Sequence, residues 1–298
     1  MKNILIIGCG LLGSSLLRKI KKKNIAKKIF IYEKSKKNVS KIKKLKLPGT
    51  IIDKLQDGVI NSDLIILCTP MSEYKNLILK MNKFLSPKTI ITDIGSSKSE
   101  SLKIIDKFLR KDIFWTSSHP ITGSEVSGPE HGKHDLFENK WCILIKEKKT
   151  NKNHLIFLNK FWKKIGSNVV TMTSEKHDKI FSITSHLPHL IAYNLVKSAQ
   201  DFEKNQNFDL IKYSAGGLRD FSRIAASNEI MWRDIFFNNN KNMSKAIDLF
   251  IKNLNSFKRD INLKNNKSIL QKLIKTKKVR SKIIKLKQDI NKPDFGRN

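Results

Sequence analysis

Short apolar runs alternate with amphipathic stretches through the first 173 residues. The runs predict strands at residues 4–7, 29–32, 63–68, 89–93, 141–145 and 168–172. Helical periodicity lies between them, at about 38–46, 72–84, 98–110 and 151–165. Continuous apolar strands separated by helices are typical of a parallel sheet covered on both faces. The pattern therefore predicts an α/β domain with a doubly wound sheet over residues 1–173.

The pattern changes after Thr173. From Ser174 to about residue 273, apolar positions recur at helical spacing and no strand is predicted. One helix is expected to begin at Ser174, a second is capped by Asn228, and a third covers 242–257. We predict an all-helical domain over residues 174–275. Residues 276–298 are Lys-rich and are expected to form a basic tail, a frayed helix with a loose end.

A glycine motif stands between the first predicted strand and the first predicted helix. It reads Gly8-x-Gly10-x-x-Gly13. In this context the first Gly permits a tight turn, the second lets a pyrophosphate approach the backbone, and the third lets helix and strand pack closely. The free N–H groups of a helix N-terminus favour a phosphate. The motif predicts a Rossmann-type sheet that binds a dinucleotide.

Other residues at the same edge of the sheet are expected to contact that cofactor. They are Leu11 and Leu12 at the start of the helix, and Thr69 and Pro70 after the third strand. Glu33 ends the second strand about twenty residues beyond the loop, where an acid binds a ribose 2′-OH and repels a 2′-phosphate. Glu33 favours NAD over NADP, although the lysines that follow it could pair with a phosphate.

Two polar residues follow predicted strands where such sheets place their ligands. Ser96 lies just after the strand at 89–93, and His119 follows a further expected strand and precedes Pro120. A neutral imidazole with a pKa near 6.5 is suited to accept the proton of an alcohol while a hydride leaves. We expect His119 to be the base, and Ser96 and Ser97 to lie near the ligand.

The helical domain carries two further polar groupings. Asp178, Ser182, Ser185 and His189 fall at i, i+4, i+7 and i+11, so they share one face, which either meets solvent or lines a wet cleft. Arg219 and Arg223 are four residues apart, with Asp220 available as a partner. Arg is suited to bidentate carboxylate binding, so we expect the pair to hold an anionic substrate. The alternative is a helix-surface ion pair.

Four motifs combine residues that composition alone would not bring together. They span Asp93–Lys98, His119–Glu125, His177–His189 and Gly216–Ala225. In these motifs, in their order and spacing, the chain resembles the prephenate/arogenate dehydrogenase family. The resemblance runs from Gly8 to about Phe237 and includes Trp232. It is carried by two domains and is therefore more specific than the glycine motif.

The resemblance implies an oxidative decarboxylation in tyrosine biosynthesis, in which a cyclohexadienol loses a hydride to NAD and its ring carboxylate as carbon dioxide. It implies that His119 accepts the hydroxyl proton and that Ser96 orients it. Arg223, Arg219, Glu125, Asp178, His189 and Trp232 are expected around a dianionic substrate. It also implies a homodimer formed through the helical domain, with Trp232 or its neighbours near the partner. No metal is required, and the choice between prephenate and arogenate stays open.

Composition changes this picture little. The chain has a formal net charge of +33, but 51 of its 59 basic residues are Lys. Phosphate and base recognition favours Arg, and the basic runs have few aromatic residues, so a nucleic-acid partner is not expected. The three cysteines show no metal or disulfide spacing, and no apolar run is long enough for a membrane span. We therefore expect a cytoplasmic protein.

Two alternatives remain beside the expected dehydrogenase. One is another two-domain NAD(P) enzyme of the β-hydroxyacid type, which also has an N-terminal glycine loop and a helical second domain. Such enzymes normally carry a catalytic Lys in the helical domain, and the motifs at 119–125 and 216–225 fit them less well. The other, more remote, is a basic nucleic-acid-binding protein on a nucleotide fold that has lost catalysis.

Overall fold

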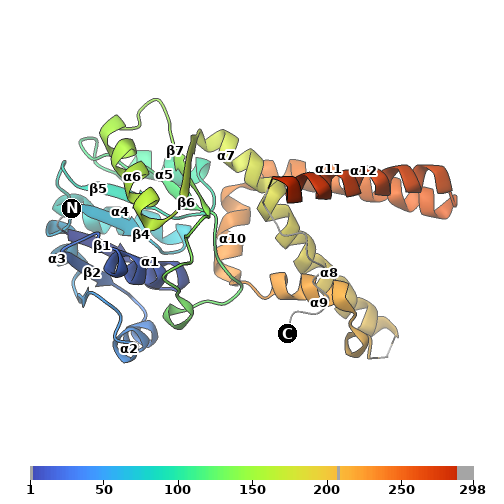
Figure 1. Ribbon diagram of the computed structural model, residues 1–298, viewed down its shortest axis with the longest axis horizontal. Coiled ribbons are helices and arrows are strands. Elements are labelled where there is room, and N and C mark those ends of the chain that lie inside the picture. Colours follow the sequence, from blue (N-terminus) through green and yellow to red (C-terminus); the bar gives the residue numbers. More distant parts are fainter. Residues whose placement is uncertain (1–2, 207–208, 287–298) are drawn as a thin grey trace.

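The computed structural model describes residues 3–206 and 209–286, which form two parts (Figure 1). The first part holds every strand of the described chain, and the second, after Met172, is entirely helical. The predicted fold class, a Rossmann-type α/β domain followed by a helical domain, is confirmed. The interface between the two parts is where the candidate site lies.

Five parallel strands form the main sheet, in the order β3-β2-β1-β4-β5. Their bounds are Asn3–Ile7 (β1), Lys28–Tyr32 (β2), Thr50–Ile51 (β3), Leu64–Leu67 (β4) and Ile90–Asp93 (β5). The pleat explains the unbroken apolar run of β1. Ile4 and Ile6 enter one core cluster, while Leu5 and Ile7 enter the cluster on the opposite face.

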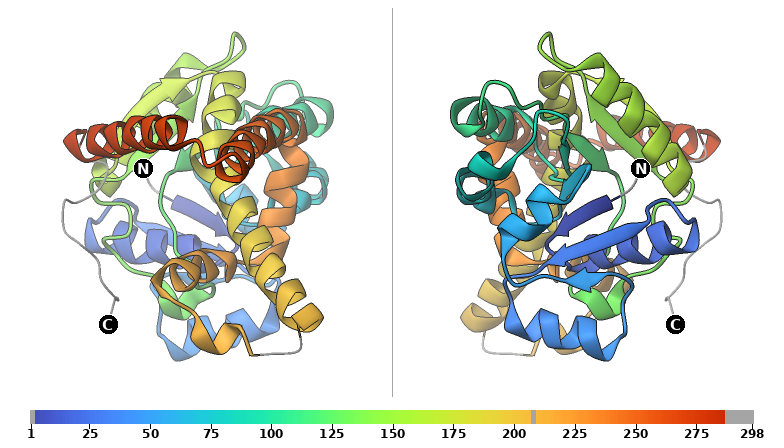
Figure 2. Two further views of the ribbon diagram at one scale, coloured as in Figure 1. Left: turned by 90° about the vertical axis from the view of Figure 1, so that its right-hand side faces the viewer. Right: turned by 90° about the vertical axis from the view of Figure 1, so that its left-hand side faces the viewer.

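Helices cover both faces of this sheet (Figure 2). They are α1 (Leu11–Lys22), α2 (Lys36–Lys44), α3 (Leu55–Ile60), α4 (Tyr74–Met81) and α5 (Ser99–Phe108), with single 3₁₀ turns η1 (Met71–Glu73) and η2 (Asn82–Phe84). Side chains of α1 pack in the cluster that contains Ile4, and those of α4 and α5 in the cluster that contains Leu5. The short elements β3 and α3 were not predicted, because two and six residues carry too little periodicity.

A second sheet is joined to the end of the first. Its strands β6 (Ser118–Pro120), β7 (Trp141–Ile145) and β8 (Asn168–Met172) run in the order β6-β7-β8, with β6 antiparallel to β7. Between them lie a 3₁₀ turn, η3 (Pro129–His131), and a helix, α6 (Lys152–Ile165). The Thr116 N–H donates to the Ile91 carbonyl at 3.0 Å, so this connection brings β6 beside β5. The sequence predicted β7 and β8 with their bounds. It placed His119 after a further strand without bounds, whereas His119 lies within β6.

The helical part begins with a single long run broken by a π-helical turn. This run comprises α7 (Ser174–Phe181), the π turn η4 (Ser182–His186) and α8 (Leu187–Gln206). In the turn, the Leu187 N–H bonds the Ser182 carbonyl five residues back. Pro188 has no N–H for an ordinary helical bond, which favours such a local change. Ser185 in this turn is half-buried, and His186 is completely buried.

The remaining helices return to the first part and then extend away from it. They are η5 (Ile211–Tyr213), α9 (Gly216–Ala225), α10 (Glu229–Asn238), α11 (Asn240–Asn262) and α12 (Asn266–Lys285). Asp234 of α10 accepts the Ser72 N–H at 2.9 Å, which ties the two parts together. Figure 1 shows α11 and α12 projecting as a hairpin. Helix α12 continues past residue 276, where the basic tail was expected to begin, and residues 287–298 lie outside the described chain.

Candidate functional site

The glycine loop has the geometry that its spacing predicts. Gly8 has a φ of +88°, and a Cβ there would lie 2.9 Å from the Cys68 carbonyl oxygen. A Cβ on Gly13 would lie 2.2 Å from the Gly8 carbonyl oxygen, so only Gly lets α1 approach β1 this closely. A Cβ on Gly10 would meet no atom within 4 Å. The open side at Gly10 is where a pyrophosphate would approach the backbone.

The N-terminus of α1 is free to receive an anion. Gly10 caps the helix without a side-chain hydrogen bond, and its first turn, which begins with Leu11 and Leu12, holds no acidic residue. The Glu33 carboxylate accepts the Cys9 N–H at 2.8 Å through one oxygen and the Ser35 N–H at 2.8 Å through the other. Glu33 is therefore held against the loop, where its remaining lone pairs can accept ribose hydroxyls.

Thr69 and Pro70 follow β4 at the same edge of the sheet. The Thr69 methyl lies against Gly8, and the Thr69 hydroxyl oxygen is buried with no hydrogen-bond partner among the described residues. A buried hydroxyl without a partner costs free energy unless a ligand supplies one. The loop, the uncapped helix, Glu33 and Thr69 together fit a bound dinucleotide.

His119 lies on β6 and is only 8% exposed. Its Nδ1 is 2.8 Å from Nε2 of His177 on α7, and Nδ1 of His177 is 2.8 Å from Oδ1 of Asp178. The ring of Phe181 packs against both imidazoles, with centroids 5.1 Å from His119 and 4.5 Å from His177. Burial holds the pKa of His119 well below its ordinary value. The imidazole is thus neutral at neutral pH, as a base requires.

Asp178 is completely buried and touches the start of α5. Its oxygens accept the Lys98 N–H at 2.9 Å and the Ser99 N–H at 2.8 Å, in addition to the contact with His177. Burial raises its pKa, but the bonds from His177 and Ser99 outweigh burial and leave the pKa below its ordinary value. The carboxylate that was expected near the substrate is therefore occupied by protein donors behind His177.

A buried ion pair holds the loop that carries Ser96. Nζ of Lys98 lies 2.7 Å from Oδ2 of Asp93 and 2.7 Å from the Ser118 carbonyl oxygen, and both charged side chains are fully enclosed. Asp93 also accepts bonds from the Tyr74 hydroxyl and from Nε1 of Trp115. Lys98 thus ties the end of β5 to the residue before His119.

The two serines of this loop have different surroundings. The Ser97 hydroxyl is buried and donates to Sδ of Met71 at 3.3 Å. Ser96 is half-buried, and its side chain forms no hydrogen bond within residues 3–206 and 209–286. Nδ1 of His186 accepts from Asn239 at 3.1 Å. Burial lowers the pKa of His186 to about 4, while the Ser96 backbone opposes that shift. Of the two hydroxyls, the Ser96 hydroxyl is the one available to a ligand.

An aromatic stack joins His189 and Trp232. Their ring centroids are 3.8 Å apart with an interplanar angle of 22°, and Nδ1 of His189 donates to the Ser185 carbonyl at 2.9 Å. This bond leaves Nε2 of His189 as an acceptor. Trp232 is 5% exposed and packs in the core against the first part of the chain. The expectation that Trp232 or its neighbours approach a partner subunit stays a prediction.

Arg223 and Glu125 connect α9 with the loop after β6. Nη1 of Arg223 lies 3.4 Å from Oε2 of Glu125, and both side chains are partly exposed. Hydrogen bonds from the Glu125 N–H and the Ser124 hydroxyl, and then Arg223, lower the pKa of Glu125. Arg223 therefore pairs with Glu125 and not with Asp220. Arg219 is exposed on the same helix, and no ion pair holds it within the described chain.

Four buried polar residues around His119 and Ser96 were not predicted as site residues: His177, His186, Lys98 and Asp93. Each stands in one of the sequence motifs, the two histidines in His177–His189 and the other two at the ends of Asp93–Lys98. The motifs were the sequence evidence that could have identified them. The motifs do not show that all four side chains are buried at the junction of the two parts.

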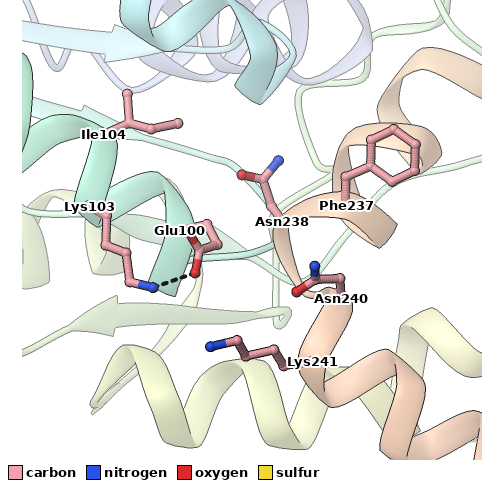
Figure 3. Close-up of a pocket in the computed structure, with 7 residues that line it drawn as sticks. All are labelled: Glu100, Lys103, Ile104, Phe237, Asn238, Asn240 and Lys241. Carbon is pink, nitrogen blue, oxygen red and sulfur yellow. Dashed lines mark hydrogen bonds and ion pairs between the residues drawn. The ribbon is translucent and has the colours of Figure 1, made fainter.

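A surface hollow lies away from these residues. It measures about 460 Å³ and is formed by α5, the end of α10 and the start of α11, with Phe237 and Lys241 on one side and Lys103 on the other (Figure 3). It contains none of the residues expected to bind substrate or cofactor. Within the described chain no three His, Cys, Asp or Glu side chains gather as metal ligands, and no helix has the length and apolarity to cross a bilayer.

Comparisons with known proteins agree with this architecture. The family model for the nucleotide-binding domain of prephenate dehydrogenase matches residues 16–171, and the model for its dimerization domain matches 173–278. The chain is 33% identical to the cyclohexadienyl dehydrogenase of Zymomonas mobilis, over 94% of this chain and 95% of that protein. It is 31% identical to the prephenate dehydrogenase of Bacillus subtilis, over 86% of this chain and 69% of that protein.

Solved structures extend the likeness to three dimensions. Prephenate dehydrogenase from Aquifex aeolicus, in complex with hydroxyphenyl propionate and NAD+, gives a TM-score of 0.88 at 34% identity, over 95% of this chain and 98% of that one. Arogenate dehydrogenase from Synechocystis shares the fold, with a TM-score of 0.76 at 22% identity over 95% and 99% of the two chains. Fold and site thus define a two-domain dehydrogenase, an oxidoreductase. The chain belongs to the prephenate dehydrogenase family, which confirms the resemblance seen in its motifs.

Proposed function

We propose that the protein catalyses the NAD-dependent oxidative decarboxylation of prephenate to 4-hydroxyphenylpyruvate, of arogenate to tyrosine, or of both. The observation that carries the proposal is the neutral, nearly buried His119, placed beside β5 at the edge where the glycine loop receives a dinucleotide. The names of the relatives support the substrates. The NAD+ complex of the Aquifex aeolicus enzyme supports the cofactor.

Residues of the first part fit the cofactor. The N–H groups at Leu11, Leu12 and Gly13 would hold the pyrophosphate, and Glu33 would accept bonds from a ribose, which favours NAD over NADP. Thr69 and Pro70 would border it at the end of β4. When bound, the nicotinamide ring accepts a hydride from the substrate carbon that bears the hydroxyl.

His119 performs the proton transfer. Its Nε2 accepts the proton of the substrate hydroxyl as the carbon–oxygen bond becomes a ketone, and the half-buried Ser96 helps to orient that hydroxyl. The ketone withdraws electrons from the ring, so the ring carboxylate leaves as carbon dioxide. The ring becomes aromatic in this step, which drives the reaction without a metal ion.

The second part would hold the substrate carboxylates. Arg223 is the first candidate, because its guanidinium reaches across to Glu125, and Arg219 is the second. The stacked pair His189 and Trp232 would border the ring of the substrate, and Nε2 of His189 remains an acceptor there. In this arrangement substrate binding depends on α8, α9 and α10, while the chemistry depends on β5 and β6.

We further propose that the protein is a cytoplasmic homodimer. The matching family model describes residues 173–278 as a dimerization domain. Apolar side chains lie exposed along α11 and α12, namely Leu249, Ile251, Leu254, Ile261, Leu270, Leu273, Ile274 and Val279. Many exposed apolar side chains on two paired helices favour an interaction site. We regard the many lysines as a general feature of the composition, and we propose no nucleic-acid or membrane partner for them.

The direct test is an assay of the purified protein with prephenate and arogenate, each with NAD and NADP. Reduced cofactor and carbon dioxide are measured together. We expect turnover of at least one substrate with NAD, with one carbon dioxide released for each reduced cofactor. Absence of turnover in all four combinations would disprove the assignment. Faster turnover with NADP than with NAD would contradict the interpretation of Glu33.

A single substitution tests the base. His119→Asn should leave NAD binding unchanged, because His119 is not part of the glycine loop, and should lower kcat at least about 100-fold, the usual worth of a general base. Binding is followed by cofactor fluorescence and turnover by absorbance. An unchanged kcat would remove His119 from the mechanism.

A further inference from the structure

Three side chains form a line from the helical part to the base. Asp178 contacts His177, and His177 contacts Nδ1 of His119, with both contacts at 2.8 Å. Asp178 and His177 are completely buried, and His119 nearly so. Phe181 closes the two rings from one side. The line therefore excludes water, and each polar hydrogen in it must be donated to a protein acceptor.

The direction of the hydrogen bonds follows from Asp178. Its Oδ1 accepts the Lys98 N–H and its Oδ2 accepts the Ser99 N–H, and a backbone N–H can only donate. These bonds favour the ionised carboxylate, which is an acceptor at both oxygens. Nδ1 of His177 must then carry a hydrogen and donate it to Asp178.

The tautomers of both histidines are then determined. Burial holds the pKa of His177 below its ordinary value, so the ring is neutral and its Nε2 is without hydrogen. That nitrogen can only accept, so Nδ1 of His119 must donate to it. His119 is neutral too, so its Nε2 carries no hydrogen and has a free lone pair. Nε2 of His119 forms no hydrogen bond within residues 3–206 and 209–286. These residues do not enclose this atom completely.

We infer that Asp178 and His177 are positioning residues that hold His119 in the tautomer with hydrogen on Nδ1 and a basic lone pair on Nε2. The inference rests on the proposed function, for which that lone pair is the proton acceptor. Without the two residues, His119 could place its hydrogen on Nε2 and be unable to accept the hydroxyl proton.

The line also accounts for the charge that the reaction creates. The O–H bond of the substrate breaks and an Nε2–H bond forms on His119, while the electron pair of the adjacent C–H bond leaves as hydride to the proposed dinucleotide. His119 becomes an imidazolium, and its Nδ1–H still donates to His177. The carboxylate of Asp178 lowers the energy of that cation through His177.

Asp178 comes from the helical part, but it caps a helix of the first part. Lys98 is the N-cap residue of α5 and offers no side-chain bond to that helix, so the carboxylate of Asp178 takes this role. Docking of the two parts and preparation of the base thus depend on the same carboxylate. The base is fully prepared only when α7 is seated against α5.

The tautomer can be observed without substrate. Long-range ¹⁵N–¹H correlation spectra of the full-length protein distinguish ring nitrogens with and without hydrogen, and loss of a signal in His119→Asn assigns the residue. We expect His119 in the Nδ1–H form at neutral pH. In His177→Leu, we expect Nε2–H to appear. Wild-type His119 in the Nε2–H form, or the same tautomer in both proteins, would overturn the inference.

Kinetics provide an independent test with matched variants. His177→Leu should lower kcat by about 10²–10³-fold while KM changes less, because a general base loses its orientation. His177→Gln keeps an amide oxygen that can accept from Nδ1 of His119, so it should retain the tautomer and recover most of the lost kcat. Asp178→Asn, which removes the charge, should lower kcat even where the tautomer persists.

A buried histidine outside the line is the control. His154 on α6 is 9% exposed and contacts Phe114, and His154→Leu should leave kcat close to that of wild type. Equal losses in His177→Leu and His177→Gln would overturn the inference, because His177 would then be structural. If the wild-type protein turned over neither substrate, the proposed function would fail, while the spectra would still decide the tautomer. If the Leu variant does not fold, the wild-type spectrum and the Gln variant retain the test.

Discussion

Replacing Lys98 by Met should destabilise the protein strongly while leaving its volume nearly unchanged. The Lys98 ammonium lies 2.7 Å from Asp93, and both side chains are 0% exposed. Met removes the cation but keeps most of the apolar stem, so the effect comes from the charge. The Asp93 carboxylate would remain buried with only neutral donors, the Tyr74 hydroxyl, Nε1 of Trp115 and the Gly95 N–H.

The expected magnitude follows from this isolation of Asp93. Removing one partner of a buried ion pair costs about 3–5 kcal/mol, because it leaves an uncompensated charge. We therefore expect Lys98→Met to lose about 3–5 kcal/mol of unfolding free energy. The double variant Lys98→Met/Asp93→Asn removes both charges, so it should be more stable than Lys98→Met alone.

Urea unfolding followed by circular dichroism measures these free energies, and equal m-values confirm that the same transition is compared. Lys103→Met is the control, since Lys103 pairs with Glu100 on the exposed face of α5 and should show almost no loss. A loss below about 1 kcal/mol in Lys98→Met would refute the reasoning, because a buried pair would then behave like a surface pair. Additive losses in the double variant would also refute it.

Three further predictions concern the cofactor loop, the substrate and acid stability. Gly13→Ala forces a methyl group to within 2.2 Å of the Gly8 carbonyl oxygen, so both Tm and NAD affinity should fall. Gly10→Ala meets no atom of the protein, so it should weaken NAD binding at unchanged Tm. Equal losses of Tm in the two variants would contradict this reasoning. Arg223→Ala should raise the KM for substrate about tenfold or more, as expected for a charged hydrogen bond, and a normal KM would count against its role. Burial alone would raise the pKa of Asp93, but Lys98 keeps that pKa below its ordinary value. The ionised Asp93 carboxylate therefore contributes to the unfolding free energy above about pH 4, and this contribution is lost as the pH falls further. Acid titration of unfolding should show this loss in the wild type and less of it in Asp93→Asn.

Local sequence patterns predicted most of the longer elements in their order and the glycine loop between β1 and α1. An apolar run of four or five residues is enough to predict a buried strand such as β1 or β4, and the glycine spacing determines which backbone can approach a phosphate. Helix caps were also local, as the Asn228 side chain accepts the Met231 N–H three residues later. These features depend on residues close together in the chain, so the sequence reveals them directly.

The polar face of the α7–α8 run shows where local patterns failed. The predicted face assumed an uninterrupted α-helix, but Ser182–His186 form a π turn whose buried side chains are those of Ser182 and His186. The role of Asp178 changed for a similar reason. Its carboxylate is directed at α5 by the packing of two domains, and no periodicity within α7 reports that packing.

The sequence alone determined the fold class and the family motifs, and it singled out His119 as the proposed base, because each depends on short segments and their order. Tertiary structure alone decided the surroundings of that base. His119 meets His177 across 58 residues of chain, and Lys98 meets Asp178 across 80. Such contacts arise only when the helical part closes on the sheet. Burial there removes water as an alternative partner, and the protein donors and acceptors then determine which nitrogen of His119 carries the hydrogen.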